Sequence, residues 1–240
     1  AAARAMPGVY AAWTAADIPE VSPIDFREGR IEKLEPYRQP VLAKGQVRYV
    51  GEPVAVIFAE DAYAAEDAAE AVTIDVEELP VLLGADETPG EFEPGRTTEV
   101  AVLVQGYGDV DAVFRTAAKV VALDLVVGRH SGVPMETRGA IARYDASRDM
   151  LELHGAAKVP HRNRESLARM FGRSLASVHL FEWHVGGGFG IRGEIYPEDI
   201  LVCVAAMRFN RPVKWIEDRQ EHLVAANHSR QQRPKVRAAV

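Results

Sequence analysis

The first part of the chain changes its hydrophobic period twice. In VRYVGEPVAVIFAED, Val54, Val56 and Phe58 alternate with Ala55 and Ile57, which predicts a strand buried on both faces. An alanine-rich helix is predicted next, over AYAAEDAAEAV, with the preceding aspartate as its N-cap and its glutamates on the solvent side. In VTIDVEELP the apolar residues take every second position, which predicts a half-buried strand. Residues 47–80 therefore predict a compact strand–helix–strand unit.

A second run of elements follows residue 107. GDVDAVFRTAAKVVALDLVV predicts a helix, capped by Asp109 or Asp111, that leads into a long apolar strand. GAIARYDASRDMLELHGA predicts a β-hairpin turned at DASRD. The remaining pattern predicts two helices and three strands: an amphipathic helix ended by Gly172, a strand over 176–185, a helix that begins near Pro197, a strand over 212–219 and the start of another strand at the C-terminus.

Residues 84–100 separate the two runs. The stretch GADETPGEFEPGRTTEV is polar and acidic and holds two prolines and three glycines, so we predict a linker. Helices and strands alternate on both sides of it. The sequence therefore predicts an α+β (mixed α/β) fold with one domain over residues 1–83 and another over 101–240.

Composition narrows the classes of function. The formal net charge of −7 disfavours general binding to nucleic acid or to an anionic membrane surface. Cys203 is the single cysteine, so the chain cannot hold a cysteine-ligated iron–sulfur cluster, and its apolar neighbours favour a buried thiol. No apolar run approaches the ~20 residues of a membrane helix. The histidines lack compact spacing with acidic or thiol partners, so we predict no protein-ligated metal.

The stretch HVGGGFGIRGE, residues 184–194, contains five glycines. It includes a formal GxGxxG, but the next helix begins only near Pro197, whereas a dinucleotide loop opens its helix directly. A phosphate loop would end in Gly-Lys-Ser or Gly-Lys-Thr, and here Glu194 follows the last glycine. Two interpretations remain: a wide turn, or a backbone wall from Gly186 to Gly190 whose N–H groups face a ligand.

Seven short motifs carry a family resemblance over nearly the full chain: AMPGV, GEPVAV, GDVDAVF, METRGA, KVPHRNR, VGGGFGIRGE and RPVKWIEDR. In this order they resemble the molybdenum-binding subunit of the xanthine dehydrogenase, aldehyde oxidase and carbon monoxide dehydrogenase family. The resemblance implies that residues 1–83 form most of an α/β hammerhead domain, without its first strands. It implies that residues 101–240 form the first part of a molybdopterin-binding domain. The family's catalytic glutamate is expected beyond Val240, so we expect no catalytic residue in this chain.

The resemblance also implies which residues meet the cofactor. Phe189 and Gly190 match residues that contact molybdopterin, and Gly187 and Gly188 are expected to shape its approach. Lys158 stands where the family has a cofactor-contacting glutamine. Its ammonium group could donate to an oxo ligand or could lie in solvent, and both alternatives stay open.

One position bears on the substrate. Purine-oxidising members of the family carry a glutamate four residues after the loop phenylalanine. Here that position is Gly193, and Glu194 follows it as a candidate substrate contact. A purine substrate is therefore not favoured.

As a whole protein, the resemblance implies a molybdenum hydroxylase that hydroxylates an aldehyde or an aromatic heterocycle with oxygen from water. The cofactor would be molybdopterin, as such or as its cytosine dinucleotide. FAD and [2Fe–2S] clusters are expected on partner subunits or domains, together with the C-terminal remainder of the molybdenum subunit and a higher oligomer. The alternative is a non-catalytic fragment or structural module, and the 240 residues alone are expected to be inactive. A cytoplasmic location is favoured, and the periplasm stays open because the N-terminus looks cut.

Two polar features have ordinary interpretations. Glu136 and Arg138 in METRG are favoured as residues that order a turn. The basic residues between 158 and 173 are favoured as a solvated helix face, because only one aromatic residue lies among them for stacking on bases.

Overall fold

The computed structural model describes residues 1–25, 31–84, 86–155 and 159–240. Helices and strands are mixed along the chain, which confirms the predicted α+β class. Two compact units are formed: Ala1–Gly29, Arg38–Glu77 and Gly132–Asn227 make the first, and Arg30–Tyr37, Glu78–Ser131 and His228–Val240 make the second. Among the described residues, no helix has both the length and the apolar character needed to cross a membrane.

A four-stranded sheet with the order β8-β7-β6-β9 forms the centre of the first unit. The predicted hairpin is present as β6 (Gly139–Asp145) and β7 (Met150–Gly155), paired in an antiparallel register. β8 (Val178–Phe181) runs parallel to β7, and β9 (Val213–Ile216) runs antiparallel to β6. β8 and β7 are joined through α3 (Pro160–Met170) and the short 3-10 helix η4 (Leu175–Ser177), as a parallel pair requires a crossover connection.

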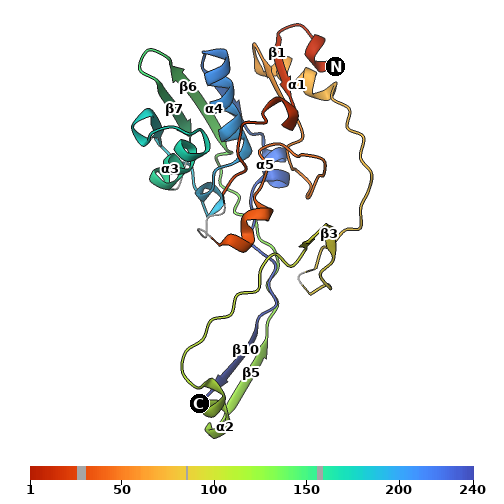
Figure 1. The fold of residues 1–240 in the computed structure, drawn as a ribbon, viewed down its shortest axis with the longest axis vertical. Helices are drawn as coiled ribbons and strands as arrows, with labels where there is room; N and C mark the ends of the chain where they lie inside the picture. Colours follow the sequence, from red (N-terminus) through yellow and green to blue (C-terminus); the bar gives the residue numbers. More distant parts are fainter. Residues whose placement is uncertain (26–30, 85, 156–158) are drawn as a thin grey trace. The chain divides into compact units, whose positions relative to one another are not determined.

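Helix α4 (Pro197–Phe209) begins at the predicted proline and packs against β6, β7 and β9 (Figure 1). Its residues from Ile200 to Ala206 are all buried. The sheet supplies the other half of this core through alternate positions, Ala140 and Ala142 on β6 and Leu151 and Leu153 on β7. Cys203 lies on α4 within the core, and burial raises the pKa of its thiol well above the ordinary value. The predicted burial of the Cys203 thiol is confirmed.

The N-terminal part of the first unit is a smaller layer. The 3-10 helix η1 (Ala3–Ala5) precedes β1 (Val9–Trp13), which pairs antiparallel with β2 (Val56–Ala59). η2 (Ala15–Asp17) follows β1, and α1 (Ala62–Glu70) follows β2 with Asp61 as the predicted N-cap. Trp13 and Phe58 pack around Phe209 of α4, with ring centroids 4.6–5.5 Å apart, which joins this layer to the main core.

The second unit is built from short elements. η3 (Glu32–Tyr37) is followed along the chain by a small hairpin, β3 (Glu91–Glu93) with β4 (Arg96–Thr97). α2 (Val110–Thr116) is capped by Asp109, whose carboxylate accepts from the N–H of Ala112. The predicted strand after this helix is β5 (Val120–Asp124), and it pairs antiparallel with β10 (Lys235–Ala239).

One local prediction from the sequence was wrong. Residues 72–80 form no strand, and Ile74 and Val76 are 54% and 63% exposed. The predicted linker over 84–100 contains the β3–β4 hairpin, because Gly95 can take the positive φ of 74° at its turn.

Candidate functional site

The glycine cluster forms the connection between β8 and α4. Its last residues enter the 3-10 helix η5 (Ile191–Gly193), and α4 begins only at Pro197. Three of its residues have positive φ: 103° at Gly187, 44° at Phe189 and 92° at Gly190. A positive φ at an L-residue other than Gly, Asn or Asp is rare and costs about 1–3 kcal/mol. Phe189 carries that strain while its ring is 77% exposed, so burial within this chain does not account for its conformation.

Two of the glycines are required by close packing. A Cβ placed on Gly186 would lie 2.6 Å from the Cβ of Glu136, and one on Gly187 would lie 2.9 Å from Cε2 of Phe189. Gly132 meets the loop from the other side, since its Cβ would lie 2.9 Å from the Cβ of Phe189. These three glycines allow the backbones to approach, so an ordinary turn accounts for them.

Gly188 differs from its neighbours. A Cβ built there meets no described atom within 4 Å, and its φ lies outside the positive range. Gly190 has the same open side, although its positive φ already favours glycine. Neither packing nor backbone geometry in the described part of the chain therefore accounts for glycine at position 188.

Glu136 and Arg192 hold the loop at its two ends. The carboxylate of Glu136 accepts a 2.7 Å hydrogen bond from the N–H of Gly186, and its Oε2 lies 3.2 Å from Nη1 of Arg192. The guanidinium of Arg192 also donates to the backbone carbonyls of Glu136 and Thr137. Its side chain is only 2% exposed, although it lies directly after the glycine cluster. Glu136, the acidic residue of METRG, therefore contacts Gly186 and Arg192 rather than Arg138.

Arg138 makes a second, buried network. Its backbone N–H and its Nε donate to the carboxylate of Glu217 at 2.9 and 2.8 Å, and Nη1 donates to Glu198 at 3.2 Å. Burial opposes the charge of Arg138, but the carboxylates outweigh it and raise its pKa. The pKa of Glu217 lies below the ordinary value. Burial opposes this shift, but the hydrogen bonds from Arg138 outweigh burial. The ring of Tyr196 lies 3.9 Å from the guanidinium carbon, and His222 contacts Glu217 through Nδ1 at 2.7 Å.

Tyr196 connects this network to the loop. Its hydroxyl donates to the carbonyl of Ile191 at 2.8 Å and accepts from the N–H of Asn227 at 3.2 Å. Its own N–H donates to the carboxylate of Asp199, which caps α4. Burial raises the pKa of Tyr196 to about 12 and that of Asp199 to about 6.

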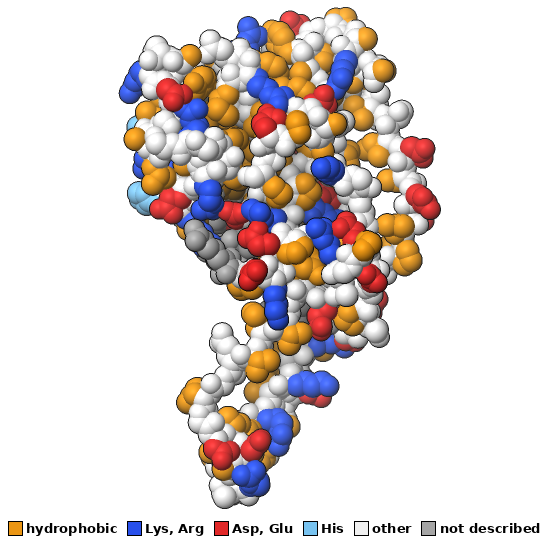
Figure 2. All heavy atoms as spheres, viewed as in Figure 1, with side chains coloured by type: hydrophobic (Ala, Val, Ile, Leu, Met, Phe, Trp, Pro, Cys, Tyr) orange, Lys and Arg blue, Asp and Glu red, His pale blue; other side chains and the backbone are white. Residues whose placement is uncertain are grey.

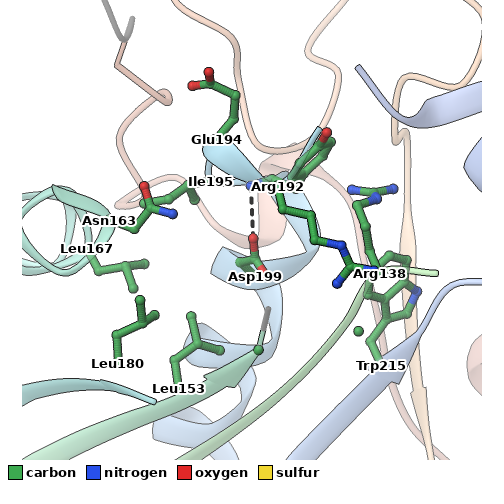
Figure 3. Close-up of a pocket in the computed structure, with 13 residues that line it drawn as sticks. Arg138, Leu153, Asn163, Leu167, Leu180, Arg192, Glu194, Ile195, Asp199 and Trp215 are labelled. Carbon is green, nitrogen blue, oxygen red and sulfur yellow. Dashed lines mark hydrogen bonds between the residues drawn. The ribbon is translucent and has the colours of Figure 1, made fainter. Parts of the chain in front are cut away.

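A cavity of about 30 Å³ lies beneath these residues (Figure 3). Leu153, Leu167 and Leu180 line one side, and Arg138, Arg192 and Trp215 line the other. The Nε of Arg192 is buried and has no hydrogen-bond partner among the described residues. The volume suffices for a water molecule, which needs about 10–15 Å³ and polar partners.

The remaining predicted residues have separate outcomes. Glu194 lies at the edge of this cavity, and its carboxylate points away from Arg192 and Asp199 in Figure 3. Lys158 lies outside the described residues. Neither Arg192 nor Tyr196 was among the predicted site residues. The signal available for Arg192 was its place beside the glycine cluster. Its burial is visible in the structure, and a buried charge needs a partner.

Residues 92–240 match the molybdopterin cofactor-binding domain, and residues 1–80 match the aldehyde oxidase and xanthine dehydrogenase a/b hammerhead domain. The chain belongs to the molybdopterin cofactor-binding domain family. The resemblance found in the seven motifs is thus confirmed. The site residues described above all lie within the molybdopterin-binding match.

Two curated relatives come from Paenarthrobacter nicotinovorans. The 6-hydroxypseudooxynicotine dehydrogenase complex subunit gamma is 41% identical over 212 residues, which cover 87% of this chain and 27% of that protein. The nicotine 6-hydroxylase large subunit is 37% identical over 239 residues, 96% of this chain and 29% of that protein. The chain therefore spans less than a third of the length of these molybdopterin-family relatives, which are named as subunits of larger assemblies.

Solved structures agree with this assignment. Quinoline 2-oxidoreductase from Pseudomonas putida 86 has a TM-score of 0.80 and 34% identity, covering 99% of this chain and 31% of that one. Carbon monoxide dehydrogenase from Oligotropha carboxidovorans has a TM-score of 0.84 and 29% identity, with the same coverage of 99% and 31%.

Proposed function

We propose that the protein containing this chain is a molybdenum hydroxylase that uses water to introduce oxygen into an aromatic nitrogen heterocycle or an aldehyde. The named activities of the relatives support the heterocycle in particular, since they include a nicotine 6-hydroxylase and a quinoline 2-oxidoreductase. The observation that carries the proposal is the strained, exposed Phe189 in a loop whose N–H groups at positions 187–190 have no partner among the described residues. A ligand surface accounts for both features, and a simple turn accounts for neither.

The loop fits the chemistry of molybdopterin. The backbone N–H groups of Gly187, Gly188, Phe189 and Gly190 have no hydrogen-bond partner among the described residues. Phosphate and metal-oxo oxygens accept hydrogen bonds and carry negative charge, so a row of free N–H donors suits them. Glycine at 188 and 190 leaves room for such an oxygen to approach the backbone.

The four loop residues have two proposed roles. Gly190 and Phe189 would contact the cofactor, and Gly187 and Gly188 would keep its approach open. The bound cofactor supplies the two-electron oxidation chemistry. Within this chain the residues orient the cofactor and shield it, and the general base is proposed to lie C-terminal to Val240. Glu194 stays a candidate substrate contact and Lys158 a candidate cofactor contact.

We propose the same domain division as the sequence predicts, with residues 1–83 and 101–240 as the hammerhead and molybdopterin-binding parts. Because the relatives are subunits, we propose that electrons leave through FAD and [2Fe–2S] clusters on partner subunits or domains. Two forms of the cofactor are proposed, molybdopterin itself and its cytosine dinucleotide, and nucleotide release on acid hydrolysis distinguishes them. A cytoplasmic location is proposed and can be checked by cell fractionation.

The test compares Gly188→Ala with Gly106→Ala in the native protein. Neither new Cβ meets a described atom within 4 Å, and neither glycine has positive φ, so both variants should fold. If the loop faces the cofactor, only Gly188→Ala lowers molybdenum and pterin content, while both keep the wild-type melting temperature or exceed it. Full cofactor content and turnover in Gly188→Ala would contradict the cofactor-wall role. Absence of molybdenum and pterin from the wild-type protein would favour a structural module.

A further inference from the structure

Both ends of the glycine loop are tied to one carboxylate. The N–H of Gly186, at the start of the loop, donates to Oε2 of Glu136 at 2.7 Å. Nη1 of Arg192, at its end, lies 3.2 Å from the same oxygen. Gly186 and Arg192 are six positions apart in the chain, and Glu136 is fifty positions before Gly186. A single side chain therefore closes the loop across its base.

We infer that Glu136 is a positioning residue that, with Arg192, holds the Gly187–Gly190 backbone in the shape that receives the cofactor. This inference rests on the proposed function of the loop. Neither residue touches the open side of Gly188, so both act through the backbone that they hold.

The backbone conformation explains why a tie is needed. The loop has positive φ at Gly187, Phe189 and Gly190, and the exposed ring of Phe189 adds little burial to stabilise that shape. Strained conformations persist only where the surroundings fix them. Here the fixing groups are the Glu136 carboxylate and the buried guanidinium of Arg192, which also donates to the carbonyls of Glu136 and Thr137.

The hydrogen bond between Glu136 and the loop also requires glycine at position 186. A Cβ there would lie 2.6 Å from the Cβ of Glu136, so only glycine lets its N–H reach the carboxylate. The requirement is local and does not involve the cofactor. It separates the glycines that serve the tie from Gly188, whose open side serves the proposed ligand.

The experiment measures the loop with and without cofactor. Glu136→Ala removes both bonds, and Glu136→Gln keeps a carbonyl for Gly186 while it loses the charge that attracts Arg192. Glu93→Ala is the matched control, because Glu93 is 43% exposed, like Glu136, and pairs with Arg96 on the β3–β4 hairpin. Each variant is made in the full native protein, loaded and also prepared from molybdate-free cells.

Hydrogen exchange in the cofactor-free protein tests the tie itself. Glu136→Ala should speed exchange of two protected amides about tenfold, that of Gly186, which loses its acceptor, and that of Ile191, which donates to the carbonyl of Gly188, and leave α4 unchanged. A tenfold change corresponds to about 1.4 kcal/mol. Glu136→Gln should lie between Glu136→Ala and wild type. Equal acceleration in α4 would indicate general destabilisation and overturn the positioning role, as would unchanged exchange in the loop.

Molybdenum content of the loaded protein tests the consequence. Glu136→Ala should lower it, Glu136→Gln should lower it less, and Glu93→Ala should leave it at the wild-type value. A loosened loop that still holds full molybdenum would show that the tie does not position the cofactor. Should the wild-type protein hold no molybdenum, the proposed function fails, and the exchange data alone decide whether Glu136 ties the loop.

Discussion

Arg138 and Glu217 form a buried pair in which one carboxylate accepts from both the backbone N–H and the side chain of the same arginine. The side chains are 6% and 0% exposed. The pair joins the turn before β6 to the residue after β9, so it closes one end of the sheet beneath the glycine loop. Its geometry satisfies both charges, and removal of one partner would leave the other charge buried.

We therefore expect Glu217→Gln to lower the free energy of unfolding by about 3–5 kcal/mol at most, because Arg138 would stay charged and buried with Glu198, 3.2 Å away, as its remaining counter-ion. Urea denaturation followed by circular dichroism measures this change. Glu20→Gln is the control, since Glu20 pairs with Arg208 and its side chain is 59% exposed. Exposed pairs contribute about 0–1 kcal/mol. Similar losses in both variants would show that burial of the Arg138 pair has no special effect.

Gly132→Ala should displace Phe189, although position 132 lies outside the glycine cluster. The new Cβ would lie 2.9 Å from the Cβ of Phe189 and 3.0 Å from its carbonyl oxygen, so the loop backbone must shift. We expect a loss of about 1–3 kcal/mol in stability, typical of overpacking, together with lower molybdenum content. Gly128→Ala, where the Cβ meets no described atom within 4 Å, should change neither. A Gly132→Ala protein with wild-type stability would mean that Phe189 moves freely.

Much of the fold could be predicted because its signals are local. Asp61 caps α1, Pro197 begins α4 and the DASRD turn joins β6 to β7, and each signal acts within a few residues. The segment over 72–80 shows the limit of such reasoning. Alternation predicts which side chains share a face, but a strand also needs a neighbour for its hydrogen bonds, and no described strand pairs with it.

The candidate site divides in the same way. A glycine cluster that ends before its helix is visible in the sequence, and the family resemblance of its motif, not the glycine pattern alone, indicated Phe189 and Gly190. The tie from Glu136 to Gly186 crosses 50 positions, and that from Tyr196 to Asn227 crosses 31. Such contacts depend on how the sheet and α4 bring distant turns together, and no periodicity within one segment encodes them.

Tyr196→Phe should loosen the entrance to α4. The phenol donates to the carbonyl of the buried Ile191 and accepts from the N–H of the exposed Asn227, so the carbonyl of Ile191 in particular would lose a buried partner. The expected loss is about 1–3 kcal/mol of stability, the cost of leaving buried polar groups unpaired. Tyr144→Phe is the control, since its hydroxyl donates to the exposed Asp149. Thermal unfolding of both variants measures the difference, and an equal shift would contradict a special role for Tyr196.

Asp199 should make stability depend on pH in an unusual direction. Burial raises the pKa of its carboxyl from 3.8 to about 6 in the folded protein. Between these values the folded state binds more protons than the unfolded state, so the contribution of Asp199 to the free energy of unfolding falls as pH rises. A shift of this size corresponds to about 3 kcal/mol as an upper limit. Asn at this position keeps an oxygen that can accept from the N–H of Tyr196 but carries no charge. We therefore expect Asp199→Asn to be more stable than wild type at pH 7 and to match it near pH 4. Urea unfolding at the two pH values measures both differences, and a variant less stable than wild type at pH 7 would show that the charged carboxylate is needed as the cap of α4.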